Sequence, residues 1–235
     1  MNWEEIKLNR DNTAYIFNGK NIFNRTFLDA LEFMPPGVAA VKDETGSYHI
    51  NTEGEKLYGH RFDRTFGFYF NRAAVVRANE WFHISLAGDR AYRHSYAWTG
   101  NFQEQLCTVR DRSNNYFHID INGNRIYKEN YCYAGDYKDG LGCVRVESGL
   151  FKHINTEGRD LNGKLFVDLG VFHKNYATAR DSIGWFHINK DGEQLYKERF
   201  RMVEPFYNGS AFVETNSKKK IIIDEGGNTI LGESI

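Results

Sequence analysis

Residues 185–192 read Trp185-Phe186-His187-Ile188-Asn189-Lys190-Asp191-Gly192, and this segment decides the fold because it recurs, with substitutions, every 34 or 35 residues. The other copies are Tyr48-His49-Ile50-Asn51, Phe82-His83-Ile84-Ser85, Phe117-His118-Ile119-Asp120 and Lys152-His153-Ile154-Asn155. A glycine follows each isoleucine by four residues, at Gly54, Gly88, Gly123, Gly158 and Gly192. A fixed period of this length indicates tandem structural repeats.

The same register extends to both ends of the chain. Ile16 is followed by Gly19 in the first unit, and Ile223 is followed by Gly227 in the last unit. We therefore predict seven copies within a single repeat-array domain, residues 1–235. The units cover about 1–27, 28–62, 63–96, 97–131, 132–166, 167–200 and 201–235.

Four further sets of residues repeat in phase with the histidine motif. Aromatic anchors stand at Phe33, Phe68, Phe102, Tyr137, Phe172 and Phe206, and slim residues follow at Val38, Ala73, Cys107, Gly142, Ala177 and Ala211. After the glycine come Tyr58, Tyr92, Tyr127 and Tyr196, with Phe23, Asn162 and Leu231 as exceptions. The last set is Phe27, Phe62, Tyr96, Tyr131, Phe166, Phe200 and Ile235. We expect all four sets to form the core.

Each unit has the pattern of three short strands. In the unit 97–131, residues 106–110 and 116–121 read as two strands separated by a polar turn. Gly123 and its asparagine neighbours tolerate positive φ and should turn the chain into a third strand over residues 125–128. The aromatic linker 131–137 should then pack over the sheet.

The middle strand indicates how the units meet. Phe82 and Ile84 point to one face while Trp81 and His83 point to the other, so both faces are largely apolar. Such a strand is expected between neighbouring sheets, as in a propeller or a stacked solenoid.

A closed ring and an open superhelix place different requirements on the first and last units of the array. Open arrays normally need polar capping repeats, whereas the terminal units keep Ile6, Leu8, Ile16, Ile223 and Ile230. Against closure, the unit is short for a four-stranded blade. We therefore predict an all-β, β-propeller-like closed ring of three-stranded antiparallel units, with an open β-solenoid or superhelix as the alternative.

Composition excludes several classes of partner. Lys and Arg total 30 against 31 Asp and Glu, a net charge of -1, which does not favour nucleic acid or an anionic membrane. The segment Met1–Glu5 lacks the features of a signal peptide, and no apolar run approaches the roughly 18 residues of a membrane span. We expect a cytoplasmic protein whose three cysteines, Cys107, Cys132 and Cys143, are buried free thiols.

Five histidines in one register raise the question of a metal site. His49, His83, His118, His153 and His187 form what we call the histidine ladder. Equivalent atoms of stacked sheets lie about 10 Å apart, whereas zinc ligands must all lie roughly 2 Å from one ion. The first unit has Tyr15 and the last has Ile222 at this position. We predict that each imidazole hydrogen-bonds a backbone carbonyl or packs on a neighbouring ring.

Other candidate chemistry is weaker. Asp111, Asp120, Asp139, Asp181 and Asp191 fall in predicted turns, where aspartate bonds its own backbone. Lys218-Lys219-Lys220 reads as a solvated hairpin tip, and the chain has no nucleophile elbow, phosphate loop or zinc-protease motif. We predict no catalytic, cofactor-binding or metal site, and hence no enzyme.

The segment 185–196, followed by Phe206-Tyr207-Asn208-Gly209-Ser210-Ala211-Phe212-Val213, resembles bacterial WG-type (KWG-like) repeats. Those units follow the patterns W-G-x-I-D-x-x-G and F-x-x-G-x-A-x-V. The resemblance extends over nearly the whole chain, although an aromatic residue replaces the glycine of the WG pair, which indicates a divergent or related class of these repeats. It implies a non-catalytic β-repeat scaffold that works beside or is fused to other modules.

We therefore expect a scaffold for protein–protein interaction, because repeat arrays present a broad surface built from their non-repeating positions. The alternative is a carbohydrate-binding module that uses aromatic residues on one rim, such as Trp98. An enzyme with a site in a central channel ranks third, since no acid, base or nucleophile stands in a recognisable constellation.

Overall fold

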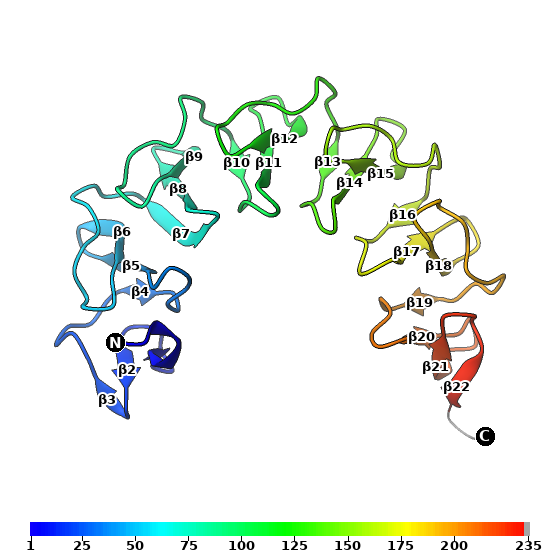
Figure 1. Cartoon of the computed structure of the whole chain (residues 1–235), viewed down its shortest axis with the longest axis horizontal. Coiled ribbons are helices and arrows are strands. Elements are labelled where there is room, and N and C mark those ends of the chain that lie inside the picture. The colour runs from blue at the N-terminus through cyan, green and yellow to red at the C-terminus, as the bar shows by residue number, and fades with distance from the viewer. Residues whose placement is uncertain (233–235) are drawn as a thin grey trace. The chain divides into compact units, whose positions relative to one another are not determined.

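The computed structural model describes residues 1–232, and within them the chain is built from short β-strands and one 3-10 helix, η1 (Trp3–Glu5) (Figure 1). The strands form seven small antiparallel sheets in chain order. The prediction of an all-β, propeller-like succession of small sheets is confirmed. Closure into a ring stays a prediction.

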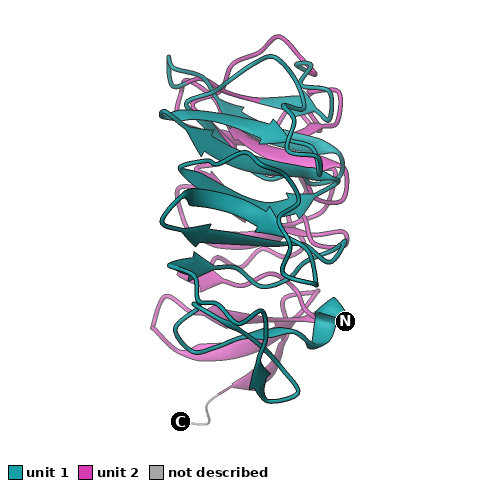
Figure 2. Cartoon of the chain, turned by 90° about the vertical axis from the view of Figure 1, so that its left-hand side faces the viewer, with its two compact units in different colours: residues 1–114, 118–125 teal, residues 115–117, 126–235 magenta. Residues whose placement is uncertain are grey.

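The chain packs as two compact units (Figure 2). The first comprises residues 1–114 and 118–125, and the second comprises residues 115–117 and 126–235. Each predicted repeat range holds the strands of one sheet. The assignment of all seven to a single domain stays a prediction.

The first four sheets follow one another along the chain and have three strands each. They contain β1 (Lys7–Leu8), β2 (Tyr15–Phe17) and β3 (Lys20–Asn21); β4 (Asp29–Ala30), β5 (Ala39–Asp43) and β6 (Gly46–Ile50); β7 (Arg64–Tyr69), β8 (Arg72–Arg77) and β9 (Glu80–Ile84); and β10 (Trp98–Thr99), β11 (Leu106–Arg110) and β12 (Tyr116–Asp120).

The remaining three sheets have the same plan. They contain β13 (Tyr133–Ala134), β14 (Leu141–Arg145) and β15 (Phe151–Asn155); β16 (Asp168–Leu169), β17 (Ala177–Arg180) and β18 (Trp185–Ile188); and β19 (Met202–Val203), β20 (Ser210–Glu214), β21 (Lys220–Asp224) and β22 (Thr229–Gly232). The last sheet thus has four strands, one more than predicted.

The predicted third strand of each unit is wrong in five of the sheets. Residues 125–128 form no strand, and a single bridge between Ile119 and Arg125 is their only ladder pairing. In the preceding sheet, Ile84 and Arg90 form the same single bridge, after which the chain turns away so that the Tyr92 ring reaches His83. The strand after the glycine forms only as β3 and β22.

The third strand comes instead from the segment predicted as a linker. Tyr133 and Ala134 lie in the 131–137 segment and form β13, which pairs with β14. The reason is local packing: Ala134 opposes Val144, and both side chains are buried. A two-residue edge strand is too short to show the alternation by which strands are recognised in a sequence.

Most of the repeating positions form the core, whereas Leu231, predicted to belong to it, is 64% exposed. The motif isoleucines Ile50, Ile84, Ile119, Ile154, Ile188 and Ile223 are all 0% exposed. The aromatic anchors and the tyrosines after the glycine are buried as well. Ile235, the last residue predicted for the core, lies outside the described residues.

Candidate functional site

Four histidines of the ladder each join their own sheet to the backbone of the next. His49 Nε2 lies 2.8 Å from the carbonyl oxygen of Phe66, which is 17 residues further along. The same spacing recurs in the bonds of His83 to Gly100, His153 to Gly170 and His187 to Glu204, at 3.0, 2.8 and 2.8 Å. Because a carbonyl can only accept, Nε2 carries the proton and donates it.

Each accepting carbonyl lies where the regular pairing of the first strand of the next sheet is interrupted or ends. Between β7 and β8 the register shifts from Thr65 to Phe68, and Phe66 lies in the irregular stretch. Such a bulge re-aims backbone groups. Here it directs the Phe66 carbonyl to His49 in the preceding sheet.

The second ring nitrogen binds a tyrosine of the same repeat. Nδ1 of His49, His83 and His187 bonds the hydroxyl of Tyr58, Tyr92 and Tyr196 respectively, and the last of these distances is 2.5 Å. With the Nε2 proton already assigned, Nδ1 must accept and the phenol must donate. Each of these imidazoles therefore has both nitrogens satisfied.

Ring packing completes the environment of the ladder. The anchors Phe68, Phe102, Phe172 and Phe206 pack on the preceding histidine with ring centroids 4.6, 4.7, 4.5 and 4.1 Å apart. Burial lowers the pKa of His49, His83, His153 and His187 from the usual value of 6.5 to about 4. These four histidines are therefore neutral structural groups at neutral pH.

These contacts confirm the predicted carbonyl bonds and ring packing of His49, His83, His153 and His187. Tyr15 takes the same role in the first sheet, since its hydroxyl donates to the Leu31 carbonyl at 2.7 Å. Within residues 1–232, no group of three or more His, Cys, Asp and Glu side chains is arranged to hold a metal ion.

Three of the aspartates noted in the sequence, Asp111, Asp120 and Asp181, bond the backbone of their own turns. Asp120 Oδ1 accepts the backbone N–H groups of Asn122 and Asn124, and Asp181 accepts those of Ile183 and Gly184. Asp111 accepts the N–H of Ser113, Asp139 accepts that of Lys174, and Asp191 is exposed. Lys218 and Lys219 are exposed beside the first residue of β21, Lys220.

The cysteines are free, but one differs from the prediction. Cys107 and Cys143 are buried, whereas Cys132 is exposed. Cys132 comes directly before the short strand β13, on the outer edge of its sheet, where its side chain has no core to enter.

The positions beside the buried pairs change from sheet to sheet, and most of them are exposed or half-buried. We use the name variable row for one cross-strand pair in each of the six sheets after the first: Asp29 with Lys42, Arg64 with Val76, Trp98 with Arg110, Tyr133 with Arg145, Asp168 with Arg180, and Met202 with Glu214. Val76 is the one buried member, at 7% exposed. The next pair inward is small or apolar in each of these six sheets, for example Ala134 with Val144. Sequence periodicity identified only Trp98 of this row, because non-repeating positions carry no periodic signal.

The variable row is rich in arginine and aromatic residues in the second unit. Arg145 opposes Tyr133 on one side and Phe151 on the other, and Tyr133 is 45% exposed. The Tyr133 ring lies 6.4 Å from that of Phe151 and 5.9 Å from that of Tyr116. In the next sheet, Arg180 likewise opposes Trp185. Directly opposed side chains share one face of a sheet.

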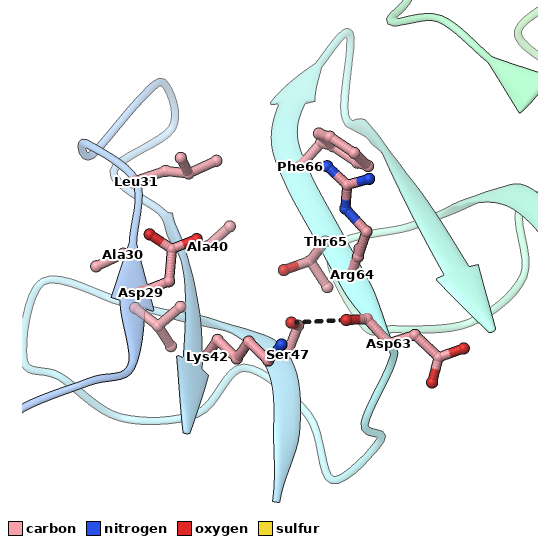
Figure 3. Close-up of a pocket in the computed structure, with 11 residues that line it drawn as sticks. Asp29, Ala30, Leu31, Ala40, Lys42, Ser47, Asp63, Arg64, Thr65 and Phe66 are labelled. Atoms are coloured by element: carbon pink, nitrogen blue, oxygen red, sulfur yellow. Dashed lines mark hydrogen bonds between the residues drawn. The ribbon is translucent and has the colours of Figure 1, made fainter. Parts of the chain in front are cut away.

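A cavity of about 250 Å³ lies beside the row in the first unit (Figure 3). The strands β4, β5 and β6 form one wall and β7 forms the other, and Ser47 Oγ donates to the Asp63 carbonyl across the bottom at 3.3 Å. The Arg64 guanidinium lies over the Phe66 ring, which stacks on Trp81 at 5.3 Å and 21°. This volume is below the roughly 300–1,000 Å³ of typical small-molecule sites.

Within residues 1–232 no helix is long and apolar enough to span a membrane.

Comparison with solved structures supports the fold. A crystal structure of a eukaryotic initiation factor superposes with a TM-score of 0.64 and 12% identity, covering 97% of this chain and 72% of that one. The computationally designed Ika8 protein superposes with a TM-score of 0.53 and 11% identity, covering 97% of this chain and 83% of the designed one. At such identities the likeness shows the fold alone. No protein-family model matches the chain, and no curated protein matches its sequence.

Proposed function

We propose that this protein is a non-catalytic β-repeat scaffold that binds another protein through the part of the variable row that lies in the second unit. The observation that supports the proposal is the contrast between adjacent positions: the buried pairs repeat, while the pairs beside them change identity in every sheet. The stability of the fold requires the buried pairs and not the pairs beside them. Variation in these neighbouring pairs suits a surface that recognises an irregular partner.

The chemistry of the second unit suits a protein partner. Tyrosine, tryptophan and arginine are the residues enriched at binding hot spots, and Tyr133, Arg145, Arg180 and Trp185 belong to the row or oppose it directly. The overall charge of -1 gives no field that favours nucleic acid. We propose a cytoplasmic location and a partner with acidic and apolar groups, either a separate protein or a fused domain.

Site-specific photo-crosslinking tests this proposal. A photoreactive phenylalanine analogue at position 133 should crosslink a defined protein in a lysate of the cells that naturally contain this chain. Tyr207 is the matched control position, because it is an exposed tyrosine outside the row. The crosslink should disappear in the Arg145→Ala background. Crosslinks that are absent, or equal at positions 133 and 207, would refute the proposal.

A glycan-binding role is the second candidate, and the stack of Arg64, Phe66 and Trp81 favours it. Flat aromatic rings beside charged groups can bind the apolar face and the hydroxyls of a sugar. A glycan array should then show a specific signal that Trp81→Ala abolishes. Silence of the array at high protein concentration would remove this candidate.

We also propose kinship with the WG-type repeats, as a divergent member. The residue that replaces the WG glycine, Phe186, is 5% exposed and lies under the Arg199 guanidinium, 3.7 Å from its ring centroid. A Phe186→Gly variant should therefore be strongly destabilised here. Unchanged stability would mean that the fold does not depend on an aromatic residue at this position of the WG pattern.

A further inference from the structure

One ladder histidine lacks the partner that its counterparts have. Nδ1 of His153 is buried and has no hydrogen-bond partner among residues 1–232, and the residue as a whole is 2% exposed. Its Nε2 donates to the Gly170 carbonyl, so the free Nδ1 is an acceptor that requires a donor. A buried polar atom without a partner destabilises the folded state.

The missing partner is the repeat tyrosine. Tyr58, Tyr92 and Tyr196 stand nine residues after their histidines and bond them, whereas the residue nine positions after His153 is Asn162. The Asn162 side chain turns elsewhere, since its Nδ2 donates to the Lys190 carbonyl at 3.4 Å. No other side chain of the described residues takes the place of the phenol on Nδ1.

The surroundings still have the form of a tyrosine site. In the other repeats the tyrosine ring covers a glycine of the next repeat, as Tyr127 covers Gly158 and Tyr196 covers Gly227. Here the corresponding Gly192 is covered by Asn162 and by the aliphatic part of Lys164. The tyrosine also packs on the aromatic residue four positions later, as Tyr196 does on Phe200 at 5.8 Å.

A surface pocket of about 500 Å³ lies beside this place. Lys164, Phe166 and Gly192 line it together with Phe186, Glu193, Gln194 and Arg199, whereas His153 and Asn162 lie outside its lining. Phe166 and Gly192 are the residues that would contact a tyrosine ring. Lys164 is exposed and is held by one bond from Nζ to the Gly192 carbonyl, so it can move aside.

We propose that the gap at Asn162 is a binding site for a p-hydroxyphenyl group, whose hydroxyl donates to His153 Nδ1 and whose ring packs between Gly192 and Phe166. The group fits because three other repeats hold the same p-hydroxyphenyl group on their histidine, as the side chain of Tyr58, Tyr92 or Tyr196. Its source is either a small phenol or a tyrosine side chain of a partner protein.

Titration of the whole protein with p-cresol tests the site. We expect a dissociation constant of about 0.1–1 mM, in keeping with the small size of the probe. The isosteric 4-methylanisole lacks the donor and should bind at least tenfold more weakly. Equal binding of the two probes would refute the bond to His153, and absence of p-cresol binding, as for a site filled by water, would refute the proposal.

Two variants locate the binding. Asn162→Tyr supplies the missing ring, so it should abolish p-cresol binding and raise the melting temperature by about 2–4 °C or more. Tyr196→Asn should create a second p-cresol site beside His187. Retention of wild-type affinity in Asn162→Tyr would place the binding elsewhere and overturn the assignment, even if Tyr196→Asn fails to fold.

N-Acetyl-tyrosinamide separates the two sources. Binding within tenfold of p-cresol would mean that a tyrosine attached to a backbone can enter, which favours a partner protein. Binding of p-cresol alone would restrict the site to small phenols.

Discussion

At the scale of single residues, the ladder histidines link the repeats and make the protein sensitive to acid. In the folded protein burial lowers the pKa of His49, His83, His153 and His187 to about 4, against 6.5 for a free side chain. Between these values the unfolded chain binds more protons than the folded chain. Stability is therefore fully present above about pH 6.5 and is lost as the pH falls toward 4.

We expect this loss to unfold the protein. A shift of this size is worth up to about 3 kcal/mol per histidine, and typical domains have only about 5–15 kcal/mol in total. Urea unfolding at a series of pH values should show a steep fall of the unfolding free energy between pH 6.5 and 4. His49→Gln should reduce the slope, whereas the exposed control His94→Gln should not. A stability that is flat from pH 7 to 4.5 would contradict the assignment.

Sequence periodicity predicted the role of the histidines but not the defect at His153. The exception at Asn162 was visible in the tyrosine series. Its consequence depends on which nitrogen of the imidazole is already bonded, and that follows only from the position of the Gly170 carbonyl in the next sheet. A one-dimensional pattern does not contain this contact.

At the scale of elements, the tyrosine and the glycine of successive repeats form a close contact. A Cβ added to Gly158 would lie 2.3 Å from Tyr127 Cδ1, whereas one added to Gly163 would have nothing within 4 Å. Both glycines have positive φ, 79° and 72°. The two positions therefore differ in packing and not in backbone conformation.

The matched variants Gly158→Ala and Gly163→Ala should separate these effects. Both incur the backbone strain of about 1–2 kcal/mol, and only Gly158→Ala adds an overpacking cost of about 1–3 kcal/mol. Chemical denaturation of the two variants measures the difference directly. Equal destabilisation would mean that the tyrosine ring does not lie on the glycine.

The aromatic anchors should be the most costly residues to truncate. Phe172 is 0% exposed and packs on His153, so Phe172→Ala should cost about 3–5 kcal/mol. Phe70→Ala serves as the control, because Phe70 is 47% exposed and should change stability by less than about 0.5 kcal/mol. An unchanged melting temperature for Phe172→Ala would show that the anchor is a surface residue.

The existence and period of the sheets could be predicted, but the strand content could not. Strands such as β11 and β12 have five residues and a clear pattern, whereas β10 and β13 have two residues each. The short strands form because their neighbours bury Thr99 and Ala134. The segment after the glycine has the composition of a strand, yet in three repeats its tyrosine leaves the sheet to reach the histidine.

At the scale of the whole molecule, the sequence predicts a closed ring. A compact chain of this length has a radius of gyration of about 18 Å. X-ray scattering from monodisperse protein should give a value near this and a symmetric distance distribution. A clearly larger radius with an elongated distribution would favour the open superhelix instead.

The repeating positions can be assigned to the fold, and the variable positions to binding, only if the histidine ladder is structural throughout the chain. A long-range ¹H–¹⁵N spectrum of the imidazoles, recorded from pH 7.5 to 6, where the protein should still be folded, tests this most directly. We predict that His49, His83, His153 and His187 stay neutral over this range with the proton on Nε2. Titration of these rings near pH 6.5, or a proton on Nδ1, would contradict the hydrogen bonds that join successive sheets.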